Sequence, residues 1–370
     1  MNDKRFDRTA DTSGAALQDS IKRDVQSDLL GDWDVADVLW RIFRDAGDVR
    51  QESLAGLAEL EISYCLCDFD TAMAEANKLI ETAEYPVAIH ARTMRMMILI
   101  ANGDADGAYQ DFCVLKKQCA DGLAQHEDEQ VYSTCLVSAM RIENVLMESL
   151  FNLPDLTEGG GADVPVGIKV YYGYLLAQRL LRLRRYGEAS GVAYTNLILL
   201  SEKFPGSRTY LYLIEASANL ILGDVERARS RFDKAWELKD RYGLLMPFIE
   251  LYFVLLGLPR VNREEIAAPE EVKRVDAIVR SFHKGWYGLR RKCGFSCVME
   301  PLTPLELITC SLVTLGWRNK EIAKHMLLSE NTVKHQLTSA YQKLGITGRS
   351  GVRDAYEVAM SDSSGFGVWP

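Results

Sequence analysis

A stretch near the end of the chain, residues 329–344, constrains the fold more than any other part of the sequence. Read as a helix, it carries an apolar stripe at the spacing of a 3.6-residue period. The stripe consists of Val333, Leu337, Ala340, Tyr341 and Leu344. The other side carries the hydrogen-bonding residues Asn331, Lys334, His335 and Thr338. Ser329 is placed to cap the N-terminus and Gly345 follows the last apolar residue, so both helix ends are marked.

Three further helices are expected around this one. Residues 319–326 form a short amphipathic segment, and only three residues separate it from the next helix, which is typical of a helix-turn-helix. Before it, Thr303 is a capping threonine, Pro304 occupies the first helical position and Glu306 completes a capping box. A fourth helix follows, with a small-residue face. This face consists of Val352, Ala355, Tyr356 and Ala359.

The polar face of the 329–344 helix suits insertion into the major groove of DNA, which is about 12 Å wide. Charge points to the same end of the chain. The chain has a net charge of −9, and residues 302–370 carry seven Lys and Arg against six Asp and Glu. That segment is therefore +1, and residues 1–301 are −10. Because an acidic body repels phosphate, DNA binding is expected to be confined to the small end domain.

Residues 302–359 resemble the LuxR-type helix-turn-helix of bacterial transcription regulators. The matching runs are Leu302-Thr303-Pro304 with Glu306, Asn319-Lys320-Glu321-Ile322-Ala323, Leu328-Ser329-Glu330-Asn331-Thr332-Val333-Lys334, Tyr341 with Lys343-Leu344-Gly345, and Arg349. The resemblance implies that the long helix reads the major groove and that the fourth helix mediates dimerisation. Two positions depart from the family pattern. Arg318 stands where the family usually has Ser or Thr as a cap, and Gln336 where it commonly has His.

The groove face and the resemblance together predict the DNA contacts. Lys334 is expected to contact bases, with secondary roles for His335 and Thr338, whereas Lys320 and Lys343 are expected to contact phosphate. The full set predicted to bind DNA is Asn331, Thr332, Lys334, His335, Thr338, Lys320, Lys343 and Arg349. The residues predicted to form a dimer contact on DNA are Val352, Ala355, Tyr356 and Ala359.

The rest of the chain reads as one helix after another from Val35 onward. Four turns, each followed by a small residue, recur in it, and their anchoring residues are Ala72, Ala108, Ala189 and Ala228. These alanines are 36, 81 and 39 residues apart, so a period of about 34–40 with two units in the long gap predicts stacked helical hairpins. The pattern resembles tetratricopeptide repeats, most clearly in the stretch that contains Ala228, Phe232 and Ala235.

The sequence thus predicts an all-α chain in four parts. Residues 1–30 are expected to be a disordered tail and residues 31–283 an array of helical hairpins, a tetratricopeptide-like solenoid. Residues 284–297, which are rich in glycine, are expected to be a linker. Residues 298–364 are expected to form the four-helix DNA-binding domain. A glycine-rich run at 158–163 is expected to be a loop or hinge inside the array.

No arrangement of residues in the sequence indicates an enzyme. The phosphate-binding loop Gly-x-x-x-x-Gly-Lys-Ser/Thr is missing, and the five histidines and eight cysteines are scattered, so neither a metal nor another cofactor is expected. No run of 18 apolar residues predicts a membrane span, and no apolar signal segment opens the chain, so a cytoplasmic protein is expected.

Two clusters allow two interpretations each. Tyrosines on the first helices of successive units (residues 171–174 and 210–212) pack in the core or line a concave surface that binds a peptide or small effector. Arg290, Arg291 and Lys292 form a solvated helix face or an auxiliary phosphate contact.

The functional prediction is a bacterial-type, sequence-specific transcription regulator. Its repeat body would sense a peptide, protein or small effector, and the body when docked could cover the groove face. The alternative is a repeat scaffold for protein interaction whose helix-turn-helix no longer binds DNA.

Overall fold

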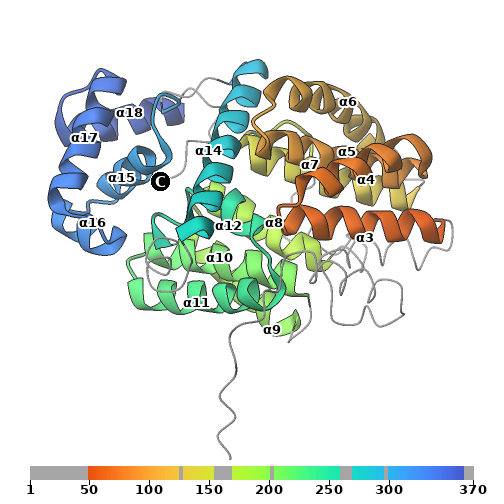
Figure 1. Cartoon of the computed structure of the whole chain (residues 1–370), viewed down its shortest axis with the longest axis horizontal. Helices are drawn as coiled ribbons and strands as arrows, with labels where there is room; N and C mark the ends of the chain where they lie inside the picture. The colour runs from red at the N-terminus through yellow and green to blue at the C-terminus, as the bar shows by residue number, and fades with distance from the viewer. Residues whose placement is uncertain are drawn as a thin grey trace, which may run out of the picture.

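The computed structural model describes residues 49–124, 128–153, 169–200, 204–258, 269–295 and 299–361. Within these ranges the chain is helical, with turns and no strand, which confirms the predicted all-α fold. A large array of helices makes up the body, and a smaller helical bundle lies at one side of it (Figure 1). The predicted tail at 1–30 and the glycine-rich run at 158–163 lie outside the described residues.

The described part of the body begins with two hairpins and a fifth helix. These are α3 (Gln51–Cys65), α4 (Phe69–Thr82), α5 (Tyr85–Ala101), α6 (Ala105–Ala124) and α7 (Glu129–Leu146). It continues with two further hairpins and two more helices. These are α8 (Lys169–Arg182), α9 (Tyr186–Leu200), α10 (Pro205–Ile221), α11 (Val225–Tyr242), α12 (Met246–Glu250) and α14 (Pro269–Lys292). None of the described helices is long and apolar enough to cross a membrane.

Each predicted anchoring alanine lies in the second helix of a hairpin, at its contact with the first. The pairs are α3 with α4, α5 with α6, α8 with α9 and α10 with α11. All four alanines are fully buried. Asp68 and Asp224 cap two of these second helices, because their carboxylates accept hydrogen bonds from the backbone N–H of Thr71 at 3.3 Å and Arg227 at 3.0 Å. Stacked hairpins are thus the architecture of the body. The gap expected to hold two units contains α7, and residues 154–168 of it lie outside the described part.

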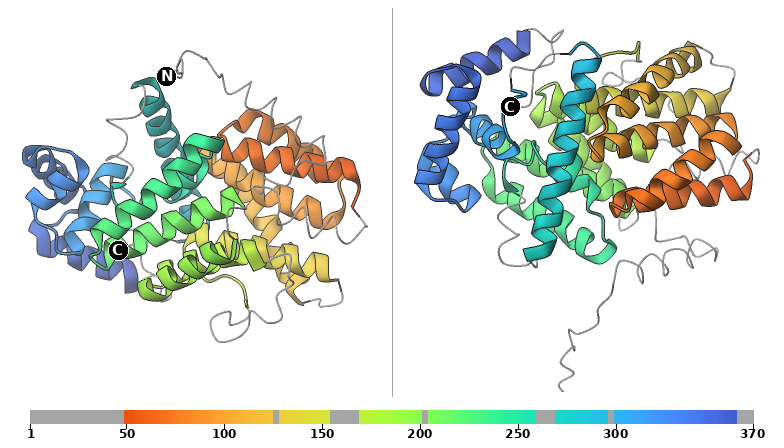
Figure 2. Two further views of the ribbon diagram at one scale, coloured as in Figure 1. Left: turned by 90° about the horizontal axis from the view of Figure 1, so that it is seen from below. Right: turned by 45° about the horizontal axis from the view of Figure 1, so that its top comes forward.

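Helix α14 runs along the body and packs against α5 and α6 (Figure 2). Residues 284–292, which we expected to belong to a linker, are instead its last turns. The glycines that suggested a linker are instead required by close packing between helices. A Cβ atom at Gly285 would collide with the carbonyl oxygen of Ile100, and one at Gly288 would lie 2.5 Å from the Cβ of Ala105. Glycine is needed here because two helix backbones meet at very short range.

The C-terminal end of α14 is fixed to the end of α7. The indole N–H of Trp286 donates to the carbonyl of Val145, and the Arg290 guanidinium donates to the carbonyl of Leu146. Arg290 also pairs with Glu148 at 3.0 Å and is only 3% exposed. These donors satisfy carbonyl groups that a helix leaves unpaired at its C-terminus. Arg290 therefore belongs to the core, and neither of the two functions considered for it from the sequence applies.

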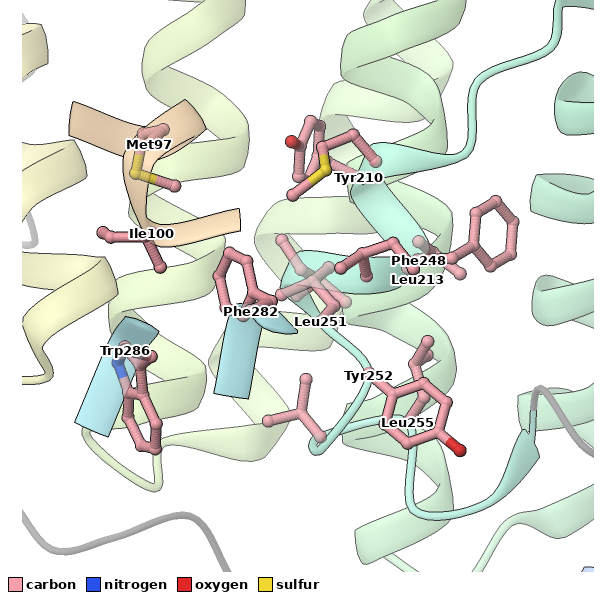
Figure 3. Close-up of a cluster of buried hydrophobic side chains, with 14 of the residues drawn as sticks. Met97, Ile100, Tyr210, Leu213, Phe248, Leu251, Tyr252, Leu255, Phe282 and Trp286 are labelled. Atoms are coloured by element: carbon pink, nitrogen blue, oxygen red, sulfur yellow. The ribbon is translucent and has the colours of Figure 1, made fainter. Parts of the chain in front are cut away.

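The core of the body lies between α14, α5 and α10 (Figure 3). Phe282 and Trp286 of α14, Met97 of α5 and Leu251 all belong to this core. Two of the tyrosines pack as core residues: the rings of Tyr174 and Tyr210 stack at 4.6 Å, and both side chains are buried. Core packing, the first of the two alternatives, thus applies to these two residues, and Tyr174 also lines a cavity of the body.

Candidate DNA-binding site

The bundle at the end of the chain consists of α15 (Pro304–Thr314), α16 (Asn319–Met326), α17 (Glu330–Leu344) and α18 (Gly348–Ser361). The predicted capping box starts α15. Thr303 N–H donates to the Glu306 carboxylate at 2.7 Å, and Glu306 N–H donates to the Thr303 hydroxyl at 3.3 Å. At α16 half of such a box remains, because arginine has no acceptor. Glu321 accepts from the backbone N–H of Arg318 at 2.6 Å, and Arg318 caps nothing with its side chain.

Helix α17 has the predicted boundaries. The Ser329 hydroxyl accepts from the N–H of Thr332 at 3.0 Å, and Gly345 ends the helix at φ +65°. The turn before it contains Leu327 at φ 52°, which lets the chain reverse between α16 and α17 within three residues. The apolar stripe faces inward, and Val333, Leu337 and Ala340 are buried.

The opposite side of α17 faces solvent. Asn331, Lys334, His335 and Thr338 are all exposed in the full chain. Thr332 is half-buried, and its hydroxyl lies 2.8 Å from that of Ser329. Figure 1 shows α17 on the side of the bundle that faces away from the body. The described part of the body therefore does not cover the groove face, in contrast to the direct occlusion considered from the sequence.

Lys343 lies at the far end of α17, beside Glu306. Its Nζ is 2.7 Å from one carboxylate oxygen, and Ser339 donates to the other at 2.6 Å. Burial would by itself raise the pKa of the Glu306 carboxyl, but hydrogen bonds from Lys343, Ser339 and Thr303 together lower it. The Lys343 ammonium is thus paired with Glu306 of α15, although its side chain stays 35% exposed. Lys320 on α16 is exposed as well, and it forms no ion pair with another described residue.

Arg349 and Gln336 also form contacts between helices of the bundle. The Arg349 guanidinium donates to the Trp317 carbonyl at 2.8 Å and to the Asn319 side chain at 2.7 Å, which ties α18 to the start of α16. Gln336 accepts from the Thr309 hydroxyl at 2.8 Å and so joins α17 to α15. Gln336, which stands where the family commonly has His, therefore takes part in a contact between α17 and α15.

The face predicted to mediate dimerisation is partly used within the domain. Val352 is fully buried and Ala355 is 8% exposed in the single chain. The side chains of Tyr356 and Ala359 lie outside the described residues.

The bundle docks on the body through α16, a contact that sequence reasoning did not find. His325 is buried, and its Nε2 lies 2.7 Å from the carbonyl oxygen of Leu256, in the turn segment after α12. Burial lowers the pKa of His325, so the neutral ring donates its Nε2–H to that carbonyl. Gly257, at φ +92°, lies close enough that an added Cβ would be 3.0 Å from Met326. The only sequence signal was a histidine placed in the inward-facing half of a short amphipathic helix.

Residues 300–355 match the family model described as "Bacterial regulatory proteins, luxR family". These residues are a LuxR-type helix-turn-helix domain. Neither the curated proteins nor the solved structures contain a match to the chain. The LuxR-type domain supports a DNA-binding regulator of bacterial transcription. This kind of domain is normally non-enzymatic, and the described residues contain no cluster of His, Cys, Asp or Glu that could hold a metal.

Proposed function

We propose that the chain is a sequence-specific transcription regulator whose helix α17 enters the major groove. The observation that carries this proposal is the division of α17 into two faces. Val333 and Leu337 lie in the core of the bundle, while the described part of the body leaves Lys334, His335 and Thr338 exposed. A helix that is fixed from behind and carries donors in front has the geometry for direct base readout.

In this proposal Lys334 contacts base edges, with Asn331, His335 and Thr338 beside it. Lys320 is the better candidate for a phosphate contact, since Lys343 is held by Glu306. Arg349 retains further N–H donors beyond its two internal bonds, so a phosphate contact is compatible with its place in the bundle. Phosphate contacts position the domain, and base contacts give it specificity.

The tetratricopeptide-like body has a regulatory role in this proposal. Its net negative charge disfavours DNA, so it adds no binding surface of its own, and stacked hairpins commonly bind peptides or other ligands. Since the groove face is exposed in the docked arrangement, regulation would act through the orientation or pairing of the LuxR-type domains. Two copies would meet half-sites about one helical turn apart, with a contact formed by exposed residues of α18.

Replacing Lys334 with Ala is expected to weaken binding to a preferred duplex by roughly 1–3 kcal/mol and to relax the sequence preference. The preferred duplex would first be selected from a random pool with the full chain. Fluorescence anisotropy at fixed salt then compares the parent with the variant on the selected and a scrambled duplex.

Lys117→Ala provides the matched control, because Lys117 is an exposed lysine on α6, far from α17 in the chain. It removes the same charge and should leave binding unchanged. Equal affinity of the parent and Lys334→Ala for the selected duplex would contradict the assignment of Lys334. Failure to select any duplex would favour the alternative, a scaffold that has lost DNA binding.

A further inference from the structure

A cavity lies where the body meets the LuxR-type domain. Its walls come from α5, α7, α8, α14, the end of α12 with the residues after it, and α15. Leu307 and Ser311, one turn apart on α15, are the contribution of the LuxR-type domain. The cavity has about 780 Å³ of empty space including its mouth.

The enclosed part of the cavity is smaller. The volume that the centre of a water molecule can occupy is about 50 Å³. This leaves room for several waters or a small organic molecule. Most of the wall is apolar, and Phe282 and Trp286 of α14 form part of it. In Figure 3 the ring of Phe282 lies beside Leu251, and Trp286 lies one turn further along α14. Such walls favour a ligand with an apolar, ring-sized part.

One wall residue points to a ligand more directly. Gln178 of α8 is only 9% exposed, and its amide has no hydrogen-bond partner among the residues that the structure describes. The amide atoms of Gln178 are not fully buried, so they line the open space of the cavity, where a bound molecule can pair with them. Nearby, Asn144 uses its N–H to donate to the Leu175 carbonyl at 3.1 Å, and no described residue donates to its amide oxygen.

The charged groups of the wall balance each other. Glu250 accepts from Arg141 at 3.1 Å and from the Tyr64 hydroxyl at 2.6 Å. The site therefore has no net charge, and a charged ligand would pay a desolvation cost without a free counter-charge to repay it. An uncharged ligand that both donates and accepts hydrogen bonds matches the amides of Gln178 and Asn144.

We propose that this cavity is an effector site for a small uncharged molecule with an apolar ring and an amide or hydroxyl end. This inference rests on the proposed function, because it specifies the effector that the body would sense. The ligand would touch the body and α15 together. Its affinity therefore depends on how the LuxR-type domain docks, and by linkage its binding changes the stability of that docking.

Phenylacetamide and phenylacetate test the class of ligand, because they have the same size and differ in charge. Isothermal titration calorimetry on the full chain should show saturable binding of phenylacetamide and at least about tenfold weaker binding of phenylacetate. Hydrogen exchange should slow in α15 and α16 when phenylacetamide is saturating.

Variants test the assigned site. Gln178→Leu should weaken phenylacetamide binding by about tenfold, and Gln178→Met, which keeps the side-chain length, should do the same. Gln110→Leu is the matched control, since Gln110 is an exposed glutamine on α6. The affinity of this variant for phenylacetamide should stay within about twofold of that of the parent. Thermal melting of each variant checks that it is folded, and using both Gln178 variants guards against a local folding defect in one.

Three results would overturn the proposal: no saturable binding of phenylacetamide, equal affinity for phenylacetate, or unchanged affinity in both folded Gln178 variants. These outcomes are independent of the DNA measurements. Binding of the probe without DNA binding would support the cavity and contradict the proposed function. DNA binding without binding of phenylacetamide would support the proposed function and contradict the cavity as an effector site.

Discussion

Val333→Asp is expected to unfold the LuxR-type domain while the body stays folded. Val333 is fully buried on the inner face of α17. A carboxylate there would have to be buried without a partner or pulled out by unfolding the helix, at a cost of at least about 3 kcal/mol. A small domain has only a few kcal/mol of stability to lose. Hydrogen exchange should therefore show loss of protection across residues 304–344 and little change in α3 to α6.

Thr338→Asp is the matched control on the same helix. Thr338 is exposed, so the same carboxylate remains solvated and α17 should keep its protection. DNA affinity should nevertheless fall in this variant, because the new charge faces phosphate. Retained protection of α17 in Val333→Asp would show that the inward face is assigned incorrectly.

Gly285→Ala is expected to destabilise the body, although alanine is the better helix former. The new Cβ would collide with the carbonyl oxygen of Ile100, so α14 would have to move away from α5. The misfit should cost roughly 1–3 kcal/mol, more than the gain in helix propensity of about 1 kcal/mol. Urea unfolding followed by circular dichroism measures the free energy of unfolding of both proteins.

Gly191→Ala is the matched control, a glycine-to-alanine change in another helix of the same body. Gly191 lies inside α9, is exposed, and a Cβ there would meet nothing within 4 Å. This substitution should raise the free energy of unfolding by about 0.5–1 kcal/mol. If both substitutions stabilise the protein, the close crossing of α14 and α5 does not exist in solution.

The LuxR-type domain was largely predictable because its signals are local. The capping box at Thr303, the cap at Ser329 and the stop at Gly345 each depend on residues within one turn of the helix end. The buried stripe of α17 follows from spacing alone. The paired helices of the body were predictable for a similar reason, since each anchoring alanine follows a turn. Whether those pairs are tetratricopeptide repeats in the strict sense remains a proposal.

The features that the sequence did not predict correctly involve residues whose partners lie far away in the sequence. Gly285 suggested a linker because glycine is ambiguous until the helix it packs against is known. Arg290 looked like a surface cation, yet its partner Glu148 lies 142 residues earlier in the chain. His325 gave no sign of its bond to Leu256, 69 residues away. Lys343 and Arg349 matched the family motif, but the sequence could not show that Glu306 and Trp317 already engage them.

The most direct test of DNA reading by α17 is photocrosslinking from its exposed face. A photoreactive phenylalanine analogue would replace His335 in the full chain, and the same analogue at Lys117 on α6 would serve as the control. With a duplex selected from a random pool, we expect position 335 to crosslink to bases inside the selected motif, and position 117 to give none. Absence of crosslinks from position 335, or equal yields with selected and scrambled duplexes, would contradict the claim that α17 reads the sequence.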